Sequence, residues 1–194
     1  LGTIDVTTVL AKSSNVGVAK IALSLKPQDM WSAFDQFGFG RVTGSGFPGE
    51  SAGILTSPDH WRPIGQATMS YGYGLSVTPL QLTQAYAVLG AGGVRRPVSL
   101  RKLDAPPEGE SVFDQKVMHE LVTMMEAVTS DAGTARRARV MGYRVAGKTG
   151  TAWKASETGG YSTNKYMAVF GGVVPASNPR LAAVVIIDEP TGGA

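Results

Sequence analysis

The sequence predicts an α+β fold, in which helices pack against an antiparallel sheet. Apolar residues recur at helical spacing in several segments of residues 7–128, whereas residues 143–187 contain short apolar runs separated by Gly-, Ser- and Pro-rich turns. Helices followed by hairpin-connected strands are typical of α+β domains. The chain has 194 residues, 43% of them hydrophobic and 17% charged, so one domain with a sizeable core is expected over residues 1–194.

Helical spacing is clear in four segments. Thr7–Leu25 predicts helix, turn and helix, because the polar run Lys12-Ser13-Ser14-Asn15 interrupts its apolar residues. Pro27–Phe37 fits a short amphipathic helix that a proline opens and a glycine closes, and Thr78–Gly90 fits a longer one. Asp114–Val128 is the clearest amphipathic helix. The apolar stripe that it is expected to bury consists of Val117, Leu121, Met124, Met125 and Val128.

The remaining segments predict loops and strands. Gly38–Pro63 is dense in Gly, Pro, Ser and Thr and predicts a long irregular connection, which is uncommon in a compact domain unless it is functional or contains short elements. Val98–Leu103 is a short strand candidate. The sheet is expected from Tyr143–Ala152, Tyr166–Val174 and Arg180–Ile187, joined by hairpin-type connections.

Composition and charge argue against several classes of protein. The net charge is +3 and the basic residues are scattered apart from Arg136, Arg137 and Arg139, so no nucleic-acid partner is expected. The absence of cysteine excludes a disulfide framework and a thiolate metal site. His60 and His119 lack a ligand-like spacing, so neither a metal centre nor a cofactor is expected. No apolar run approaches the roughly 18 residues that span a bilayer.

The most informative motif is Lys148-Thr149-Gly150-Thr151, inside a predicted strand. Side chains alternate along a strand, so the two threonine hydroxyls share one face, while the lysine supplies a cation and Gly150 lets a ligand backbone approach closely. Such a surface suits a carboxylate. The structural alternative is a polar edge strand, but Gly147 and Gly150 are costly in a strand unless something must come close.

A second motif, Ser13-Ser14-Asn15, lies in the polar turn between the first two predicted helices. Ser13 and Asn15 are expected to point into a cleft while Ser14 faces away. Alone, the triplet is explained equally well by a helix cap or a turn. Together with Lys-Thr-Gly, however, it supplies two of the three elements of the Ser-x-x-Lys, Ser-x-Asn and Lys-Thr-Gly signature of class A β-lactamases and penicillin-binding proteins.

The surrounding sequence resembles the class B penicillin-binding proteins, specifically the division-associated (septal) transpeptidases of Gram-negative bacteria, over essentially the whole chain. The resemblance implies a penicillin-binding/β-lactamase-like transpeptidase fold on the periplasmic face of the inner membrane, with division-machinery membrane proteins as partners and the anchor outside this chain. The residues that carry it are Phe37-Gly38-Phe39-Gly40, Gly46-Phe47-Pro48-Gly49-Glu50, Ser70-Tyr71-Gly72-Tyr73-Gly74-Leu75-Ser76-Val77-Thr78-Pro79-Leu80-Gln81-Leu82, Gly133-Thr134-Ala135 and Val174-Pro175-Ala176.

The chain departs from the family pattern at the nucleophile. The Ser-x-x-Lys element precedes Ser-x-Asn in the family, but residues 1–12 contain no serine, so the chain is expected to begin downstream of it, to lack the last strand and helix, and to be inactive alone. Ser162-Thr163-Asn164-Lys165 matches Ser-x-x-Lys literally. We expect it in a connection between strands, where no helix places the lysine one turn from the serine, and do not assign it as nucleophile.

The resemblance implies two-step acyl transfer from D-alanyl-D-alanine stem peptides of peptidoglycan, with β-lactams binding as mimics of the dipeptide. Lys148, Thr149 and Thr151 would recognise the terminal carboxylate, and the backbone N–H of Thr151 would be an oxyanion-hole donor. Ser13 would relay a proton toward the leaving amine. Asn15 would hydrogen-bond the substrate backbone or the catalytic lysine.

Three aromatic residues, Tyr166, Tyr71 and Tyr73, are candidates for the rim of the substrate pocket, Tyr166 foremost, although packing explains each of them as well. Nothing marks Glu50 or Asp59 as the carboxylate base that a β-lactamase uses for deacylation. Two alternatives stay open. One is a serine β-lactamase, which typically has a shorter stretch between Ser-x-Asn and Lys-Thr-Gly. The other is a non-catalytic domain that senses penicillin or holds partners.

Overall fold

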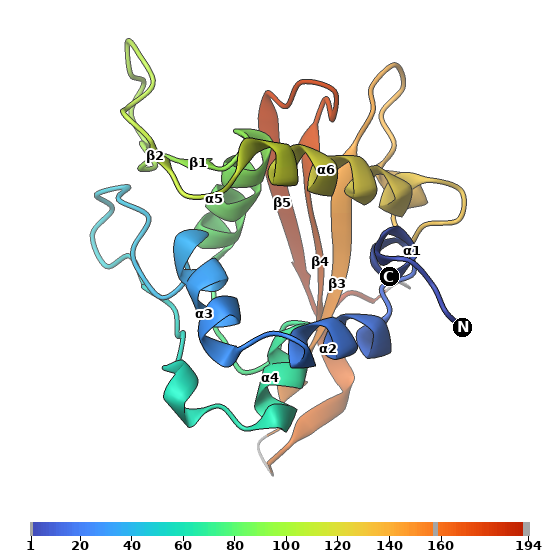
Figure 1. The fold of residues 1–194 in the computed structure, drawn as a ribbon. Helices are drawn as coiled ribbons and strands as arrows, with labels where there is room; N and C mark the ends of the chain where they lie inside the picture. The colour runs from blue at the N-terminus through green and yellow to red at the C-terminus, as the bar shows by residue number, and fades with distance from the viewer. Residues whose placement is uncertain (1, 157–158, 192–194) are drawn as a thin grey trace.

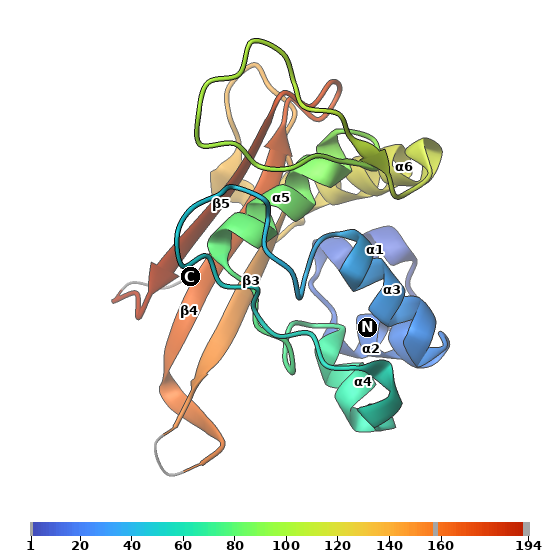
Figure 2. The ribbon, with the colours of Figure 1, turned by 90° about the vertical axis from the view of Figure 1, so that its left-hand side faces the viewer.

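The computed structural model describes residues 2–156 and 159–191. In Figures 1 and 2 the helices lie on one side of a three-stranded antiparallel sheet, with α5 and α6 packed directly on it and α1 to α4 further along the same side. The predicted α+β class is confirmed.

The sheet has the strand order β3-β4-β5. Its strands are β3 (Ala146–Ala155), β4 (Tyr161–Val174) and β5 (Leu181–Asp188), all antiparallel to their neighbours. The three predicted strands are therefore confirmed, although β3 begins later than predicted and β4 begins earlier, at Tyr161. Because β3 pairs only with β4 among the described residues, one edge of β3 remains open.

The predicted helices are also present. They are α1 (Val6–Ala11), α2 (Asn15–Leu23), α3 (Pro27–Gln36), α5 (Pro79–Gly90) and α6 (Gln115–Glu126). Side chains at the N-caps explain several of the starts: a carboxylate caps α1, serine hydroxyl caps α2 and a Thr-Gln capping box opens α5. Prolines in the first turn of α3 and α5 are pre-organised for the helix.

The differences from the sequence prediction include one helix that was not expected and one expected strand that does not form. The sequence did not predict α4 (Pro63–Met69), which follows the short 3₁₀ helix η1 (Pro58–His60). The strand expected at Val98–Leu103 does not form. Those residues lie in the loop between β1 (Val94–Arg95) and β2 (Glu110–Ser111), where the backbone of Val98 bonds Thr43 of another loop instead of a strand. Two more 3₁₀ turns, η2 (Ala127–Thr129) and η3 (Arg136–Ala138), follow α6.

The main core lies between α6, α5 and the inner face of the sheet. It includes Met118, Val122 and Met125 of α6 with Ala146 of β3 and Val173 of β4. The stripe predicted for α6 is therefore wrong by about one residue at its start. Val117 is more than half exposed, because Met118 occupies the inward position in that turn.

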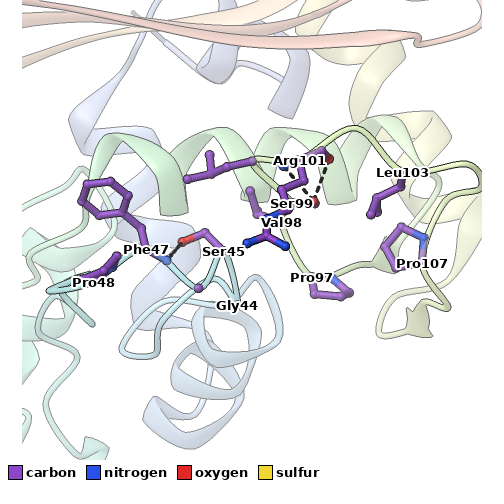
Figure 3. Close-up of a pocket in the computed structure, with 12 residues that line it drawn as sticks. Gly44, Ser45, Phe47, Pro48, Pro97, Val98, Ser99, Arg101, Leu103 and Pro107 are labelled. Carbon is purple, nitrogen blue, oxygen red and sulfur yellow. Dashed lines mark hydrogen bonds between the residues drawn. The ribbon is translucent and has the colours of Figure 1, made fainter.

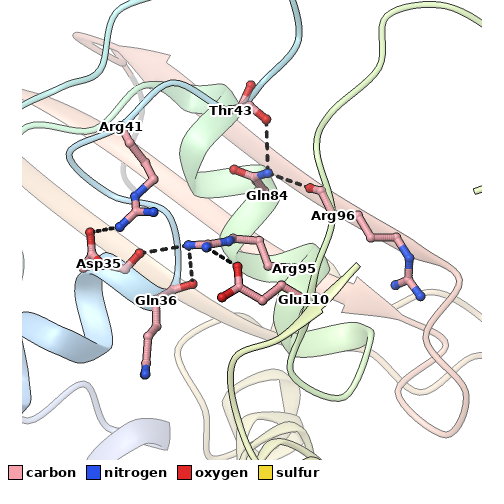
Figure 4. Close-up of polar contacts among 8 residues, drawn as sticks. All are labelled: Asp35, Gln36, Arg41, Thr43, Gln84, Arg95, Arg96 and Glu110. Carbon is pink, nitrogen blue, oxygen red and sulfur yellow. Dashed lines mark hydrogen bonds and ion pairs between the residues drawn. The ribbon is translucent and has the colours of Figure 1, made fainter. Parts of the chain in front are cut away.

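Two buried glutamines of α5 hydrogen-bond the long connection. Gln81 is fully buried; its side-chain amide donates to the carbonyl oxygens of Arg41 and Ala52, both at 2.8 Å. Gln84 in the next turn donates to the carbonyl of Arg96 at 2.8 Å, as Figure 4 shows. Backbone carbonyls of an irregular loop need such partners when they are buried, and α5 supplies them.

Arg95 joins α3 to β1 and β2. Its guanidinium donates to the carbonyl oxygens of Asp35 and Gln36 at the end of α3, at 3.1 and 3.2 Å, and pairs with Glu110 at 2.7 Å (Figure 4). The last carbonyls of a helix lack intrahelical donors, so a cation there stabilises the helix end. Arg41 pairs with Asp35 beside it.

Candidate active site

Lys148 and Ser13 meet at the open edge of β3, although 135 positions separate them in the sequence. The Lys148 Nζ donates to Ser13 Oγ at 2.7 Å and to the carbonyl oxygen of Thr149 at 2.7 Å. The lysine comes from the inner face of β3 and the serine from the turn between α1 and α2. Of the residue pairs that the sequence singled out, this one is brought into direct contact.

The local structure of the α1–α2 turn explains the position of Ser13. The Ser14 hydroxyl accepts the N–H of Gly17 at 3.1 Å and caps α2, which matches the structural interpretation of that serine. Ser13 itself has a left-handed backbone, with φ of 51°, which costs a non-glycine residue roughly 1 kcal/mol. Asn15 is the first residue of α2 and its side chain is exposed.

Burial lowers the pKa of the Lys148 ammonium below its ordinary value of 10.5. The physical cause is desolvation, which disfavours the charged form. A lysine in this state releases its proton more readily than a solvated one. The Ser13 hydroxyl accepts a hydrogen bond from its ammonium.

The backbone of β3 presents hydrogen-bonding groups at the open edge. The N–H of Trp153 points away from β4, since it donates to the Tyr73 hydroxyl at 3.2 Å. Backbone direction alternates along a strand, so the N–H groups of Thr151 and Thr149 point to the same open edge. The side chain of Thr151 is exposed there.

The two glycines around Lys148 are explained by different features of the structure. A Cβ on Gly147 would lie 2.5 Å from the ring of Phe170, so that glycine is required by packing within the sheet. A Cβ on Gly150 would meet only Val169, at an ordinary 3.7 Å. The space above Gly150 is therefore open to a ligand, whereas the space above Gly147 is already filled.

Thr134 is a residue of the site whose contact the sequence did not predict. Its hydroxyl lies 2.8 Å from that of Thr149, on the opposite side of the β3 edge from Ser13. Lys12 supports the same segment by donating to the carbonyl oxygen of Ala132 at 2.8 Å. The only signal in the sequence was that Gly133-Thr134-Ala135 carries part of the family resemblance, and that signal gave no contact.

Comparison with known proteins shows the family of the chain. The family model described as "Penicillin binding protein transpeptidase domain" matches residues 1–194. The chain belongs to this family. Together with the relatives named D,D-transpeptidase FtsI and PenA, this match confirms the resemblance to class B penicillin-binding proteins.

Curated relatives of this transpeptidase chain carry names of peptidoglycan enzymes. The chain is 45% identical over 190 residues to "Peptidoglycan D,D-transpeptidase FtsI" of Escherichia coli K12, covering 98% of this chain and 32% of that protein. It is 43% identical to "Probable peptidoglycan D,D-transpeptidase PenA" of Neisseria gonorrhoeae over 188 residues, 97% of this chain and 32% of that protein. The chain thus spans about a third of these relatives.

Solved structures share the fold. The apo transpeptidase domain of Burkholderia pseudomallei penicillin-binding protein 3 is 46% identical with a TM-score of 0.93, covering 98% of this chain and 58% of that one. Penicillin-binding protein 3 of Mycobacterium tuberculosis complexed with aztreonam is 33% identical with a TM-score of 0.89, covering 96% of this chain and 46% of that one. The predicted transpeptidase fold is therefore confirmed.

Tyr166 lies on the outer face of the sheet in this transpeptidase chain. It pairs across the ladder with Trp153, and the two rings are 5.4 Å apart in an edge-to-face arrangement. Thr151 shares that face, and its direct ladder partner is Ala168. Tyr73 packs its ring 4.8 Å from Tyr161 while it caps the β3 edge.

The sequence predicted Ser162 in a connection between strands, but the structure places it near the start of β4. The strand pairing extends further than the turn residues suggested. Its hydroxyl oxygen accepts the backbone N–H groups of Asn164 and Lys165 at 3.3 and 3.0 Å. The ammonium of Lys165 lies 4.0 Å from the carboxylate of Glu189. These contacts do not form the serine-lysine pair that a nucleophile needs.

The candidate site does not coincide with the hollow of about 440 Å³ shown in Figure 3, which is lined by residues of the segments 44–48 and 97–107. None of the candidate site residues lines it. Within residues 2–156 and 159–191, no group of three or more His, Cys, Asp or Glu side chains is arranged to hold a metal ion. Nor does any helix in that part of the chain have the length and apolar character needed to cross a membrane.

Proposed function

We propose that this chain forms the Lys-Thr-Gly side of the active site of a peptidoglycan D,D-transpeptidase. That enzyme cross-links the septal cell wall and is acylated by β-lactams. The observation that carries the proposal is the 2.7 Å contact between Lys148 and Ser13 at an open strand edge. The relatives named D,D-transpeptidase FtsI and PenA support the same reaction.

The open edge of β3 fits the terminal carboxylate of a D-alanyl-D-alanine peptide. Lys148 supplies a cation there, and the hydroxyls of Thr149 and Thr151 supply hydrogen-bond donors. The substrate backbone lies across Gly150, where no side chain intervenes. The N–H of Thr151 donates to the carbonyl oxygen as negative charge develops on it.

The acyl transfer proceeds in two steps. A serine outside this chain gives its proton to a lysine that accompanies it and attacks the carbonyl carbon between the two D-alanines, and the C–N bond breaks as the terminal D-alanine leaves. Ser13 passes a proton to the departing amine, and Lys148 replaces the proton on Ser13. The amine of a neighbouring stem peptide then attacks the ester, and its proton returns through Ser13 to Lys148. The serine oxygen takes back its own proton as the C–O bond breaks and the new amide forms.

Asn15 and Tyr166 have positioning roles in this proposal. Asn15, one residue from Ser14 at the start of α2, hydrogen-bonds the substrate backbone or a lysine that accompanies the nucleophile. Tyr166 borders the pocket on the face of the sheet that also carries Thr151. Location on the periplasmic face of the inner membrane and contact with division-machinery membrane proteins are further parts of the proposal, supported by the name FtsI of the relatives.

Intact-mass analysis and peptide mapping test the proposal. The full parent polypeptide is incubated with benzylpenicillin, and we expect a stable adduct on a serine that precedes Leu1. An adduct on Ser162 would place the active site elsewhere, and the absence of any adduct would contradict acyl transfer.

Two competing functions give different results after acylation. A serine β-lactamase would release the adduct quickly and hydrolyse a chromogenic cephalosporin with many turnovers. A penicillin-sensing or scaffolding domain would keep the adduct but form no cross-linked product from stem peptides. A transpeptidase keeps the adduct with β-lactams and cross-links peptides in their absence.

A further inference from the structure

A turn between η3 and β3 exposes an apolar side chain almost completely. Val140 and Tyr143 form an antiparallel bridge, and Gly142 between them has a left-handed φ of 80° with open space around it. Met141, at the tip of this turn, is 98% exposed. The sequence placed Tyr143 at the start of a strand, but the structure places it in the turn, where it is 60% exposed.

The turn stands beside a hollow of about 550 Å³. Val140, Met141 and Tyr143 line it together with Thr129, Ser130 and Val145. Its charged lining residues are Arg139, Arg144 and Glu126, the last of which pairs with Arg144. In Figure 1 the segment between α6 and β3 loops out past the end of the sheet, away from α2, α3 and α4. Exposed apolar groups gathered around a hollow are typical of a docking surface.

The charge around the turn is positive and only partly compensated. Arg139 pairs with Asp131 at 3.0 Å, and Arg144 pairs with Glu126 at 2.6 Å. Arg136 and Arg137 are exposed and form no ion pair with any residue that the structure describes. These are the clustered arginines that stood out in the sequence, and the active site does not use them.

We propose that the turn 140–143 and the arginines around it dock an acidic segment of a partner protein. A large apolar side chain of the partner fills the hollow beside Met141, and carboxylates on either side of it face Arg136 and Arg137. Arg, Tyr and Met are enriched in protein interfaces, and methionine adapts its shape to different apolar partners. Complementary charge gives such a contact specificity and a fast association rate.

A protein segment fits these observations better than a lipid surface does. Anionic lipid would also attract arginines and an exposed apolar tip. A flat bilayer surface, however, has no side chains that would enter a hollow. The hydroxyls of Thr129 and Ser130 in its wall already donate to the carbonyl oxygens of Val145 and Ala127, so they can only accept from a ligand. A peptide has side chains that enter a hollow and backbone groups that bond its wall.

The test selects binders to the full parent polypeptide from a displayed library of random peptides. We expect enrichment of peptides with Asp or Glu on both sides of one large apolar residue. The affinity of a selected synthetic peptide is then measured by fluorescence anisotropy against variants. Met141→Asp and the double variant Arg136→Glu/Arg137→Glu should each weaken binding at least about 10-fold, and raising the salt concentration should weaken binding to the unchanged protein.

Matched controls separate this surface from general effects. Leu100→Asp places the same charge at another exposed apolar position, and Lys102→Glu reverses a charge beside it; both should leave peptide affinity within about two-fold. The rate of acylation by benzylpenicillin should be unchanged in the Met141 and Arg136/Arg137 variants, which shows that they fold. If the parent were not acylated at all, the proposed function would fail while the docking test remained valid.

Three results would overturn the proposal. The first is a library that yields no enriched peptide, the second is enriched peptides that lack acidic residues, and the third is binding that is insensitive to the Met141 and arginine changes. Binding of the parent to phosphatidylglycerol vesicles, lost in Met141→Asp and without any peptide enrichment, would assign the surface to a membrane instead.

Discussion

The two faces of the β3-β4-β5 sheet differ sharply, although the same strands form both. On the inner face, Ala146 and Val173 are fully buried under α5 and α6, and Lys148 extends from the same face into the site. On the outer face of β5, Leu181 and Ile187 are 67% and 53% exposed. The contrast shows that the surroundings on each face, and not membership in the strand, decide how a side chain behaves; for Lys148, burial lowers the pKa of its ammonium.

Two lysines of β3 show the same point. Lys148 is partly buried and contacts Ser13 of the α1–α2 turn, and desolvation lowers its pKa. Lys154 lies further along the strand on the same face, where hydrogen bonds to Asp188 and Glu189 raise its pKa. Lys148 therefore releases its proton more readily than a solvated lysine, whereas Lys154 forms exposed ion pairs, which contribute little to stability.

The largest effect is expected at Lys148. Lys148→Met in the parent polypeptide removes the cation and the proton donor beside Ser13, so the rate of acylation by benzylpenicillin should fall by about 10²- to 10⁴-fold. Lys154→Met is the matched control and should change the rate less than about two-fold. Stopped-flow or gel-based acylation measurements decide; equal rates for the two variants would contradict the assignment of the site.

The packing of the inner face predicts the next largest effect. A Cβ on Gly171 would lie 2.1 Å from the ring of Tyr86 in α5, so Gly171→Ala should lower the free energy of unfolding by about 1–3 kcal/mol. Gly150→Ala is the control, because its Cβ would have an ordinary contact, and should change stability by less than about 0.5 kcal/mol. Urea unfolding of the parent polypeptide measures both. A larger loss for Gly150→Ala would reverse the comparison.

Replacing valine by threonine should lower the unfolding free energy by different amounts on the two faces of the sheet. Val173→Thr buries a hydroxyl on the inner face and should lower the unfolding free energy by about 1–3 kcal/mol. Val185→Thr on the outer face, where the side chain is 54% exposed, should cost less than about 0.5 kcal/mol and reduce aggregation of the isolated 194-residue chain. Denaturant unfolding and light scattering test the pair. A sharp thermal transition of the monodisperse chain, without aggregation, would show that the exposed face is harmless.

The sequence predicted the sheet, most helices and the two motifs because those features depend on local spacing. It did not predict the contact of Thr134 with Thr149, since nothing local relates a loop residue to a strand fifteen positions later. The Val98–Leu103 expectation failed for the opposite reason. A short apolar run predicts a strand only if a partner strand is available, and Thr43 of a loop provides the hydrogen bond instead.

The smallest effect concerns pH and uses the two lysines again. The pKa of Lys148 is lowered in the folded protein, so between that pKa and 10.5 the unfolded chain binds more protons and folding becomes more favourable as pH rises. The pKa of Lys154 is raised, so its contribution is complete below 10.5 and declines as pH rises through the folded value. Comparing the unchanged protein with Lys148→Met and with Lys154→Met at several pH values cancels the other titrating groups. The free energy of unfolding of the unchanged protein minus that of Lys148→Met should rise as pH rises toward 10.5. The same difference for Lys154→Met should stay level and then fall. Parallel curves of stability against pH for the two variants would contradict the opposite pKa shifts of the two lysines.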